Sequence, residues 1–179
     1  SMGGFIAQTI CLNHPAKAMS LTSLYSHPGN GLDFGPAPEV METLFTPSPD
    51  DREGYIEHMT NRFKLIFGSG MPFDEVFHRN LAGTYYDRCF YRQGVMRQFM
   101  AIMTQKDRTE ELSQINIPTL VIHGDDDPMV PLAGGEATAA AIPNARLKVI
   151  KGMGHVMPNL DAYWSDILNE MVEHMKAVH

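Results

Sequence analysis

The chain has 179 residues, a formal net charge of −7 and a hydrophobic fraction of 44%. This length and composition are typical of a globular domain with its own core and exclude a disordered chain. Lysine and arginine are scattered and form no basic stripe, which argues against nucleic acid as a partner. No apolar run is long enough to span a bilayer, and the first residues lack a signal-peptide pattern, so we expect no membrane association. Two cysteines, Cys11 and Cys89, make no disulfide framework and favour a cytoplasmic protein.

The first predicted element is a helix of about three turns that starts at the first residues and stops at His14-Pro15. A short strand, Met19–Ser26, follows and ends in the turn residues 28–31. Gly3 and Gly4 are explained by close packing of the helix on the strand, which a side chain would block. No strand precedes this helix, so the edge of Met19–Ser26 is expected to be uncovered.

Four helices are predicted between residues 32 and 110, where prolines separate stretches with apolar residues at three- and four-residue spacing. The stretches are Pro38–Phe45, Asp51–Phe67, Phe73–Asp87 and Tyr91–Thr104. Ser48 or Asp50 is expected to cap the second of them. Because a crossover between parallel strands needs only one helix, this segment is interpreted as an all-helical cap. Its methionine and aromatic side chains either line a hydrophobic substrate pocket or form the helices' own core.

Two later strands are predicted to end in polar loops. Thr119–Ile122 is a run of apolar and β-branched residues, typical of a parallel strand buried on both faces, and it leads into His123 and three acids. Arg146–Ile150 leads into a glycine-bounded loop that carries His155. Functional groups gather at the carboxyl ends of such strands, so an acid and an imidazole are expected at one edge. Flanking helices are predicted at Pro131–Ile142 and Leu160–Met175.

A serine, an acid and a histidine therefore occur in that order at the ends of successive predicted elements. A serine hydroxyl becomes nucleophilic when a histidine removes its proton, and a buried acid fixes the tautomer of that histidine. Ser1 opens the first helix, one of the acids in 125–127 follows the first of the two later strands, and His155 follows the second. This chain order is associated with α/β-hydrolases.

The chain resembles the α/β-hydrolase superfamily in three short motifs. Residues 1–4, SMGG, are similar to the second half of the nucleophile elbow G-x-S-x-G-G. Residues 123–128, HGDDDP, look like the acid loop of that superfamily, and residues 152–155, GMGH, look like its terminal histidine loop. Within the superfamily the chain is similar to the aclacinomycin methylesterase-like esterases, through CLNHP after the elbow, LTSLYS on the next strand and the helical cap.

The resemblance covers essentially the whole chain and implies an α/β fold. It implies the C-terminal part of an α/β-hydrolase, with three parallel strands and flanking helices in residues 1–31 and 111–179, and a cap inserted at 32–110. The strands that precede the nucleophile in the superfamily have no counterpart here. The loop that usually gives a second oxyanion donor is also missing, and losing one such donor costs ~2.7–4 kcal/mol of transition-state stabilisation.

The function that the resemblance implies is a serine-type carboxylic ester hydrolase that works through an acyl-enzyme. The nucleophile falls on Ser1, the base on His155, the acid on Asp127 and one oxyanion donor on the backbone N–H of Met2. The expected substrate is a small hydrophobic ester, and no cofactor or metal is implied. Lactonase, thioesterase and perhydrolase activities use the same triad and stay open.

Four explanations remain for a sequence that starts at the expected nucleophile. The chain is the C-terminal portion of a longer enzyme, or it is a short protein that forms a homodimer through the exposed strand edge. Alternatively, Ser1 is left from a cloning linker before a native Met2, or the α-amino group of Ser1 acts as its own base. The alternative function is a catalytically impaired hydrolase remnant that acts as an oligomerising or partner-binding module.

Other polar residues have a structural interpretation beside the functional one. Asp126 is the second choice for the triad acid, and Asp125 and Asp126 are otherwise expected in a solvated loop. A metal at residues 125–127 is disfavoured, because the spacing lacks the alternating ligands of a calcium loop. His123 is interpreted as a hydrogen-bonded structural histidine and Cys11 as a core residue.

Overall fold

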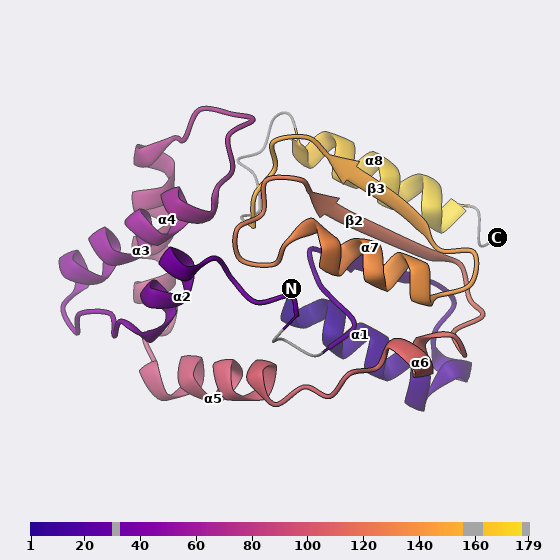
Figure 1. Ribbon diagram of the computed structural model, residues 1–179. Helices are drawn as coiled ribbons and strands as arrows, with labels where there is room; N and C mark the ends of the chain where they lie inside the picture. The colour runs from indigo at the N-terminus through magenta and orange to yellow at the C-terminus, as the bar shows by residue number, and fades with distance from the viewer. Residues whose placement is uncertain (30–32, 156–162, 177–179) are drawn as a thin grey trace.

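A three-stranded parallel sheet, with the strand order β1-β2-β3, lies at one end of the molecule (Figure 1). The structure is a computed structural model that describes residues 1–29, 33–155 and 163–176. The strands are β1 (Leu21–Leu24), β2 (Thr119–Gly124) and β3 (Arg146–Ile150). In the sheet, Leu21 pairs with Thr119, and Leu120 pairs with Arg146. The predicted α/β class with three parallel strands is confirmed.

Helices make up most of the remaining chain. They are α1 (Met2–Asn13), the 3₁₀ helix η1 (Pro15–Lys17), α2 (Pro38–Phe45), α3 (Arg52–Ile66), α4 (Glu75–Arg88), α5 (Arg92–Met103), α6 (Thr109–Leu112), α7 (Leu132–Ala141) and α8 (Tyr163–Lys176). Four of them, α2 to α5, lie between β1 and β2 as predicted, whereas α6 was not predicted. Residues 160–162 of the last predicted helix lie outside the described residues. No helix in the described ranges is long and apolar enough to cross a membrane.

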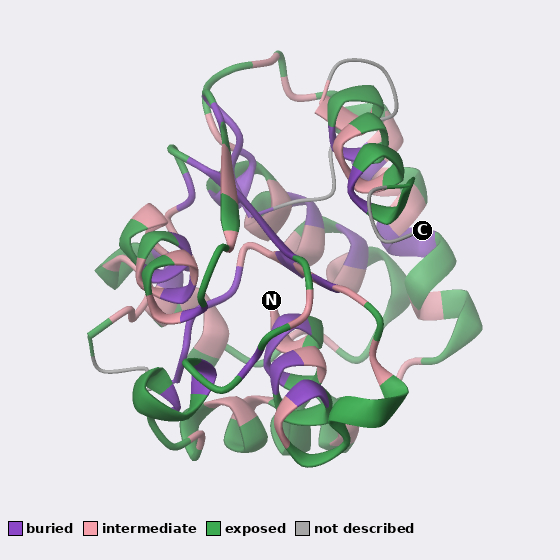
Figure 2. Cartoon of the chain, turned by 90° about the vertical axis from the view of Figure 1, so that its right-hand side faces the viewer, coloured by how far each residue is buried: buried purple, intermediate pink, exposed green. Residues whose placement is uncertain are grey.

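Both faces of the sheet are covered, which explains why β2 shows no alternation of polar and apolar residues. All six residues of β2 are buried. Leu120 packs with Ile167 of α8 on one face, and Leu21 packs with Cys11 of α1 on the other. Figure 2 shows buried residues gathered in the strands and on the inward sides of the flanking helices. The interpretation of Cys11 as a core residue is confirmed by its 6% exposure.

The first strand is shorter than the predicted Met19–Ser26. Met19 is 67% exposed and contributes nothing to the sheet core. Tyr25 has a φ of 35°, in the left-handed region that bulky residues rarely adopt. This turn of the backbone ends β1 at Leu24, although the N–H of Tyr25 still donates to the carbonyl of Ile122 at 2.9 Å.

The cap of α3 differs from the prediction of Ser48 or Asp50. Asp51 occupies the N-cap position, and its carboxylate accepts a hydrogen bond from the Gly54 N–H at 2.8 Å. Asp50 instead pairs with Arg92 at 3.0 Å, and the carbonyl of Ser48 accepts a hydrogen bond from the same guanidinium. The prediction was wrong because Asp51 takes the N-cap position, while the side chain of Asp50 pairs with Arg92 of α5.

Close packing of α1 explains Gly4 but not Gly3. A Cβ atom on Gly4 would lie 2.5 Å from the Cβ of Ser26, which follows β1. A Cβ atom on Gly3 would meet nothing within 4 Å. The prediction for Gly3 was therefore wrong, because Gly3, one residue before Gly4 on the helix, faces open space.

Gly4→Ala is expected to destabilise the protein by about 1–3 kcal/mol, because the new methyl group overlaps the Cβ of Ser26. Gly3→Ala, one position away on the same helix, is the control. It is expected to leave stability unchanged or raise it by up to about 1 kcal/mol through helix propensity. Urea denaturation followed by circular dichroism gives both values. Equal effects of the two substitutions would contradict the close approach of α1 to Ser26.

Candidate active site

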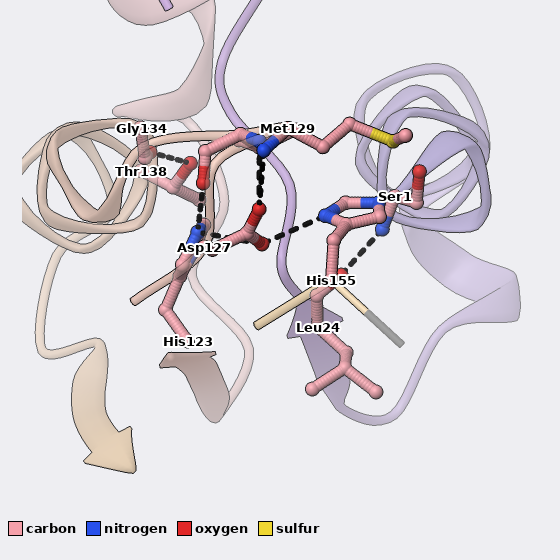
Figure 3. A network of polar contacts seen from close by, with 9 residues as sticks. Ser1, Leu24, His123, Asp127, Met129, Gly134, Thr138 and His155 are labelled. Atoms are coloured by element: carbon pink, nitrogen blue, oxygen red, sulfur yellow. Dashed lines mark hydrogen bonds and ion pairs between the residues drawn. The ribbon is translucent and has the colours of Figure 1, made fainter. Parts of the chain in front are cut away.

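The loops after β2 and β3 meet at one edge of the sheet. The register brings Gly124, at the end of β2, opposite Ile150, at the end of β3. In the loops that follow, the Nδ1 atom of His155 lies 2.7 Å from the Oδ2 atom of Asp127 (Figure 3). The side chain of Asp127 is fully buried, and that of His155 is only 6% exposed. The predicted acid and imidazole are thus brought together in a dry environment.

The hydrogen bonds around Asp127 indicate which ring nitrogen of His155 donates to it. The Oδ1 atom of Asp127 accepts hydrogen bonds from the backbone N–H groups of Met129 and Val130, both at 2.9 Å. Because an ionised carboxylate can only accept, the Nδ1 atom of His155 is assigned as the donor, and in the neutral imidazole the Nε2 atom then carries the lone pair. That Nε2 atom is buried and has no hydrogen-bond partner among the described residues.

The histidine loop is held by the end of α3. The backbone N–H of His155 donates to the carbonyl of Ile66 at 2.7 Å, and that of Gly154 donates to the carbonyl of Phe67 at 3.0 Å. A Cβ atom on Gly154 would lie 2.2 Å from the same Ile66 carbonyl, so this approach requires glycine. The helices between β1 and β2 therefore help to place the imidazole.

Ser1 lies at the N-cap position of α1, close to the end of β1. Its α-amino group donates to the carbonyl of Leu24 at 2.5 Å (Figure 3). Burial lowers the pKa of this amino group to about 5, although the charge of Asp127 opposes the shift. Among the described residues, no hydrogen bond joins the Ser1 hydroxyl to the Nε2 atom of His155. Met2 is the first residue of α1, where backbone N–H groups have no partner within the helix.

Tyr25 is a site residue that the sequence reasoning missed. The centroid of its ring lies 4.5 Å from that of the His155 ring, with an angle of 52° between the ring planes. Burial, together with the charge of Asp127, raises the pKa of Tyr25 to about 12, so the phenol stays neutral. Tyr25 lies in the run LTSLYS, but that run was interpreted only as a strand and not as part of the site. Its position directly after a strand, at the edge where the other loops meet, is the signal that could have identified it.

Asp125 and Asp126 connect loops and do not touch His155. The carboxylate of Asp126 accepts a hydrogen bond from the Ser69 N–H at 2.7 Å, and that of Asp125 accepts one from the Gly152 N–H at 2.5 Å. Both residues are exposed, as expected, but both also tie the acid loop to its neighbours. In the described part of the chain, no group of three or more His, Cys, Asp or Glu side chains could hold a metal ion.

His123 supports the acid loop from inside the sheet. Its Nε2 atom donates to the carbonyl of Val130 at 2.8 Å and lies 3.7 Å from the carboxylate of Asp127. Burial lowers the pKa of His123, so the ring is neutral. The interpretation of His123 as a hydrogen-bonded structural residue is confirmed.

His27 packs beneath α1, where its ring centroid lies 4.6 Å from that of Phe5. The Nδ1 atom of His27 accepts a hydrogen bond from the Gly29 N–H at 3.1 Å. Burial lowers the pKa of His27 to about 4, and the nearby guanidinium of Arg108 acts in the same direction. This histidine is therefore neutral in the folded protein near pH 7.

The match to a known family covers most of the chain. The family described as alpha/beta hydrolase fold matches residues 1–158. The chain belongs to the α/β-hydrolase family. Esterases are among the relatives of this α/β-hydrolase: a rhodomycin D methylesterase from Streptomyces peucetius is 27% identical, over 88% of this chain and 59% of its own length. A non-heme haloperoxidase from Rhodococcus erythropolis is 38% identical over 45% of this chain and 32% of its own length.

Solved structures share the fold of this α/β-hydrolase. The meta-cleavage product hydrolase from Pseudomonas fluorescens IP01 superimposes with a TM-score of 0.72 at 20% identity, covering 100% of this chain and 63% of that one. A thermophilic esterase from Thermogutta terrifontis gives a TM-score of 0.68 at 20% identity, covering 100% of this chain and 63% of that one. The chain thus spans less than two thirds of the length of these relatives.

The free energy of unfolding is expected to fall as the pH is lowered from about 6.5 toward 4, because the unfolded chain binds a proton at His27 and the folded chain does not. The contribution of His27 to this loss is up to about 3 kcal/mol. His27→Gln should reduce the slope of the free energy of unfolding against pH by the equivalent of about one proton. His14→Gln, at an exposed position, should leave this slope unchanged. Urea titrations at a series of pH values measure the slopes. A slope that His27→Gln does not alter would argue against a neutral buried His27.

Proposed function

We propose that this chain carries the catalytic centre of a serine-type carboxylic ester hydrolase. Ser1 is the nucleophile, His155 the general base and Asp127 the residue that orients His155. The observation that carries the proposal is the buried 2.7 Å contact between Asp127 and His155, beside which the Nε2 atom of His155 has no hydrogen-bond partner among the described residues. Such an imidazole can take a proton from a hydroxyl group.

The reaction proceeds in two halves. In the first, His155 takes the hydroxyl proton of Ser1 while the serine oxygen attacks the ester carbonyl, and the resulting oxyanion accepts a hydrogen bond from the Met2 N–H. His155 then gives the proton to the leaving alcohol, and an acyl-enzyme remains on Ser1. In the second half, His155 takes a proton from water, the hydroxide attacks the acyl carbon, and the carboxylic acid leaves as Ser1 regains its proton. The N-terminus of α1 adds a positive dipole end near the oxyanion.

We infer that α2 to α5 act as a cap over this edge and favour a small hydrophobic ester. The contacts of Ile66 and Phe67 with the histidine loop support this role. An apolar cluster of Val40, Ile66 and Phe67 packs against Met129, whose N–H binds the Asp127 carboxylate. This buried cluster fixes the helical segment against the acid loop, so that the segment stands beside the site where an ester would bind.

What covers the open edge of β1 decides whether this chain is an active hydrolase. Among the described residues, β1 pairs with β2 alone, and on the neighbouring helix Ile6 and Ile10 are 51% and 44% exposed. Because the relatives are longer, we favour an N-terminal segment that adds a strand at this edge. The same segment would supply the second oxyanion donor. The alternative is an impaired hydrolase remnant that forms a homodimer strand to strand. Size-exclusion mass with fluorophosphonate labelling separates the two, since a stable unlabelled dimer supports the remnant.

Ser1→Ala is expected to abolish hydrolysis of p-nitrophenyl acetate. Asp127→Asn should lower kcat by up to about 10⁴-fold, because an amide at this position favours the wrong tautomer of His155. Asp126→Asn is the matched control and should stay close to the parent rate, since Asp126 contacts Ser69 and not His155. Initial rates over a range of substrate concentrations, with circular dichroism of each variant, provide the comparison. Equal rates for Ser1→Ala and the parent chain would rule out the assignment of the nucleophile.

A further inference from the structure

A cavity of about 310 Å³ lies within the helical segment, apart from the Asp127–His155 pair. Its walls come from the end of α2, the middle of α3, the connection between α4 and α5, and the start of α5. Ser1, Asp127 and His155 do not line it. Pockets that bind small molecules have volumes of roughly 300–1,000 Å³, so this cavity is large enough for a small ligand.

The walls of the cavity are mostly apolar. The side chains that dominate them are Phe45, Tyr55, Met59, Phe90, Val95 and Met96. Two of these, Val95 and Met96 on α5, are 60% and 53% exposed. Apolar surface that lines a hollow and is open to water is typical of a site for an apolar group.

One wall carries a guanidinium group that has no acidic partner. The Nη2 atom of Arg62 donates to the carbonyl of Thr43 and lies 3.0 Å from the Nε2 atom of His58. Its Nη1 atom contacts the sulfur of Met59 at 4.0 Å. Its Nε atom is buried without a hydrogen-bond partner, and no carboxylate of the described residues forms an ion pair with Arg62.

The surroundings of Arg62 do not neutralise its charge. Burial lowers the pKa of Arg62, which reflects the cost of holding the cation away from water. Burial lowers the pKa of His58, and the charge of Arg62 acts in the same direction, so the adjacent imidazole is neutral. Arg92, the other arginine in the walls, is already paired with Asp50 at 3.0 Å. The cavity therefore combines apolar walls with one uncompensated positive charge.

We propose that this cavity is a binding site for a monocarboxylate with an apolar body, such as a medium-chain fatty acid. The carboxylate lies against Arg62, where it supplies the missing negative charge. The apolar body lies between α3 and α5, against Met59 and Val95, and covers apolar surface that is now exposed to water. An uncharged molecule of the same shape would leave the guanidinium without a counter-ion.

Isothermal titration calorimetry with decanoate, and with decanamide as the uncharged counterpart, tests this proposal. Decanoate is expected to bind at one site per chain, at least 10-fold more tightly than decanamide. Arg62→Met should weaken decanoate binding at least 10-fold and bring it to the level of decanamide. Lys64→Met, which removes the same charge from an exposed position of α3 outside the cavity walls, should change the affinity less than 3-fold.

A second variant keeps the test valid if Arg62→Met fails to fold. Val95→Trp fills the cavity without removing a contact of Arg62, and it is expected to abolish decanoate binding while thermal unfolding stays cooperative. Ser1→Ala should bind decanoate like the parent chain, which separates this site from hydrolysis. Equal affinities for decanoate and decanamide, or decanoate binding that survives Val95→Trp unchanged, would overturn the proposal. The absence of any decanoate binding to the folded parent chain would do the same.

Discussion

The hydrogen bond between the buried carboxylate of Asp127 and the imidazole of His155 is the contact on which the candidate site depends. A carboxylate without hydrogen-bond donors is very costly in such a dry position. Here three N–H groups point at Asp127, from His155, Met129 and Val130. The acid loop therefore fixes the direction of the Asp127 carboxylate, and Asp127 in turn fixes which nitrogen of His155 faces it.

The sheet and its neighbours build this contact together. Parallel pairing of β2 with β3 brings two loops to one edge, and glycines allow them to touch: a Cβ atom on Gly124 would lie 1.9 Å from the carbonyl of Met153. The end of α3 then holds the backbone of His155. Tyr25 covers the imidazole ring from the end of β1. All three strands and the helical segment thus contribute to the position of one side chain.

The sequence predicted those parts of the fold that local chemistry decides. The non-alternating run at Thr119–Ile122 identified a doubly covered strand, and prolines marked the limits of α2 at Pro38–Phe45. The contact between Asp127 and His155 was also predicted, through the resemblance to a hydrolase family. Predictions failed where distant contacts decide. Residues 48–51 offer several polar side chains that could cap α3, and pairing of Asp50 with Arg92 left the role to Asp51.

Two other features could not be predicted for the same reason. The difference between Gly3 and Gly4 depends on which side of α1 faces Ser26, and two adjacent glycines carry no information about that. The left-handed backbone of Tyr25 and its contact with His155 depend on how β1 meets β2. The isolated charge of Arg62 becomes visible only when the three-dimensional neighbours of its guanidinium are known.

Reaction of the folded chain with a fluorophosphonate, followed by peptide mapping in a mass spectrometer, tests the central claim most directly. If the lone pair of His155 activates the hydroxyl of Ser1, the adduct maps to Ser1 and is lost when His155 is replaced by glutamine. An adduct on a different serine, or no adduct on a chain that circular dichroism shows to be folded, would contradict the account.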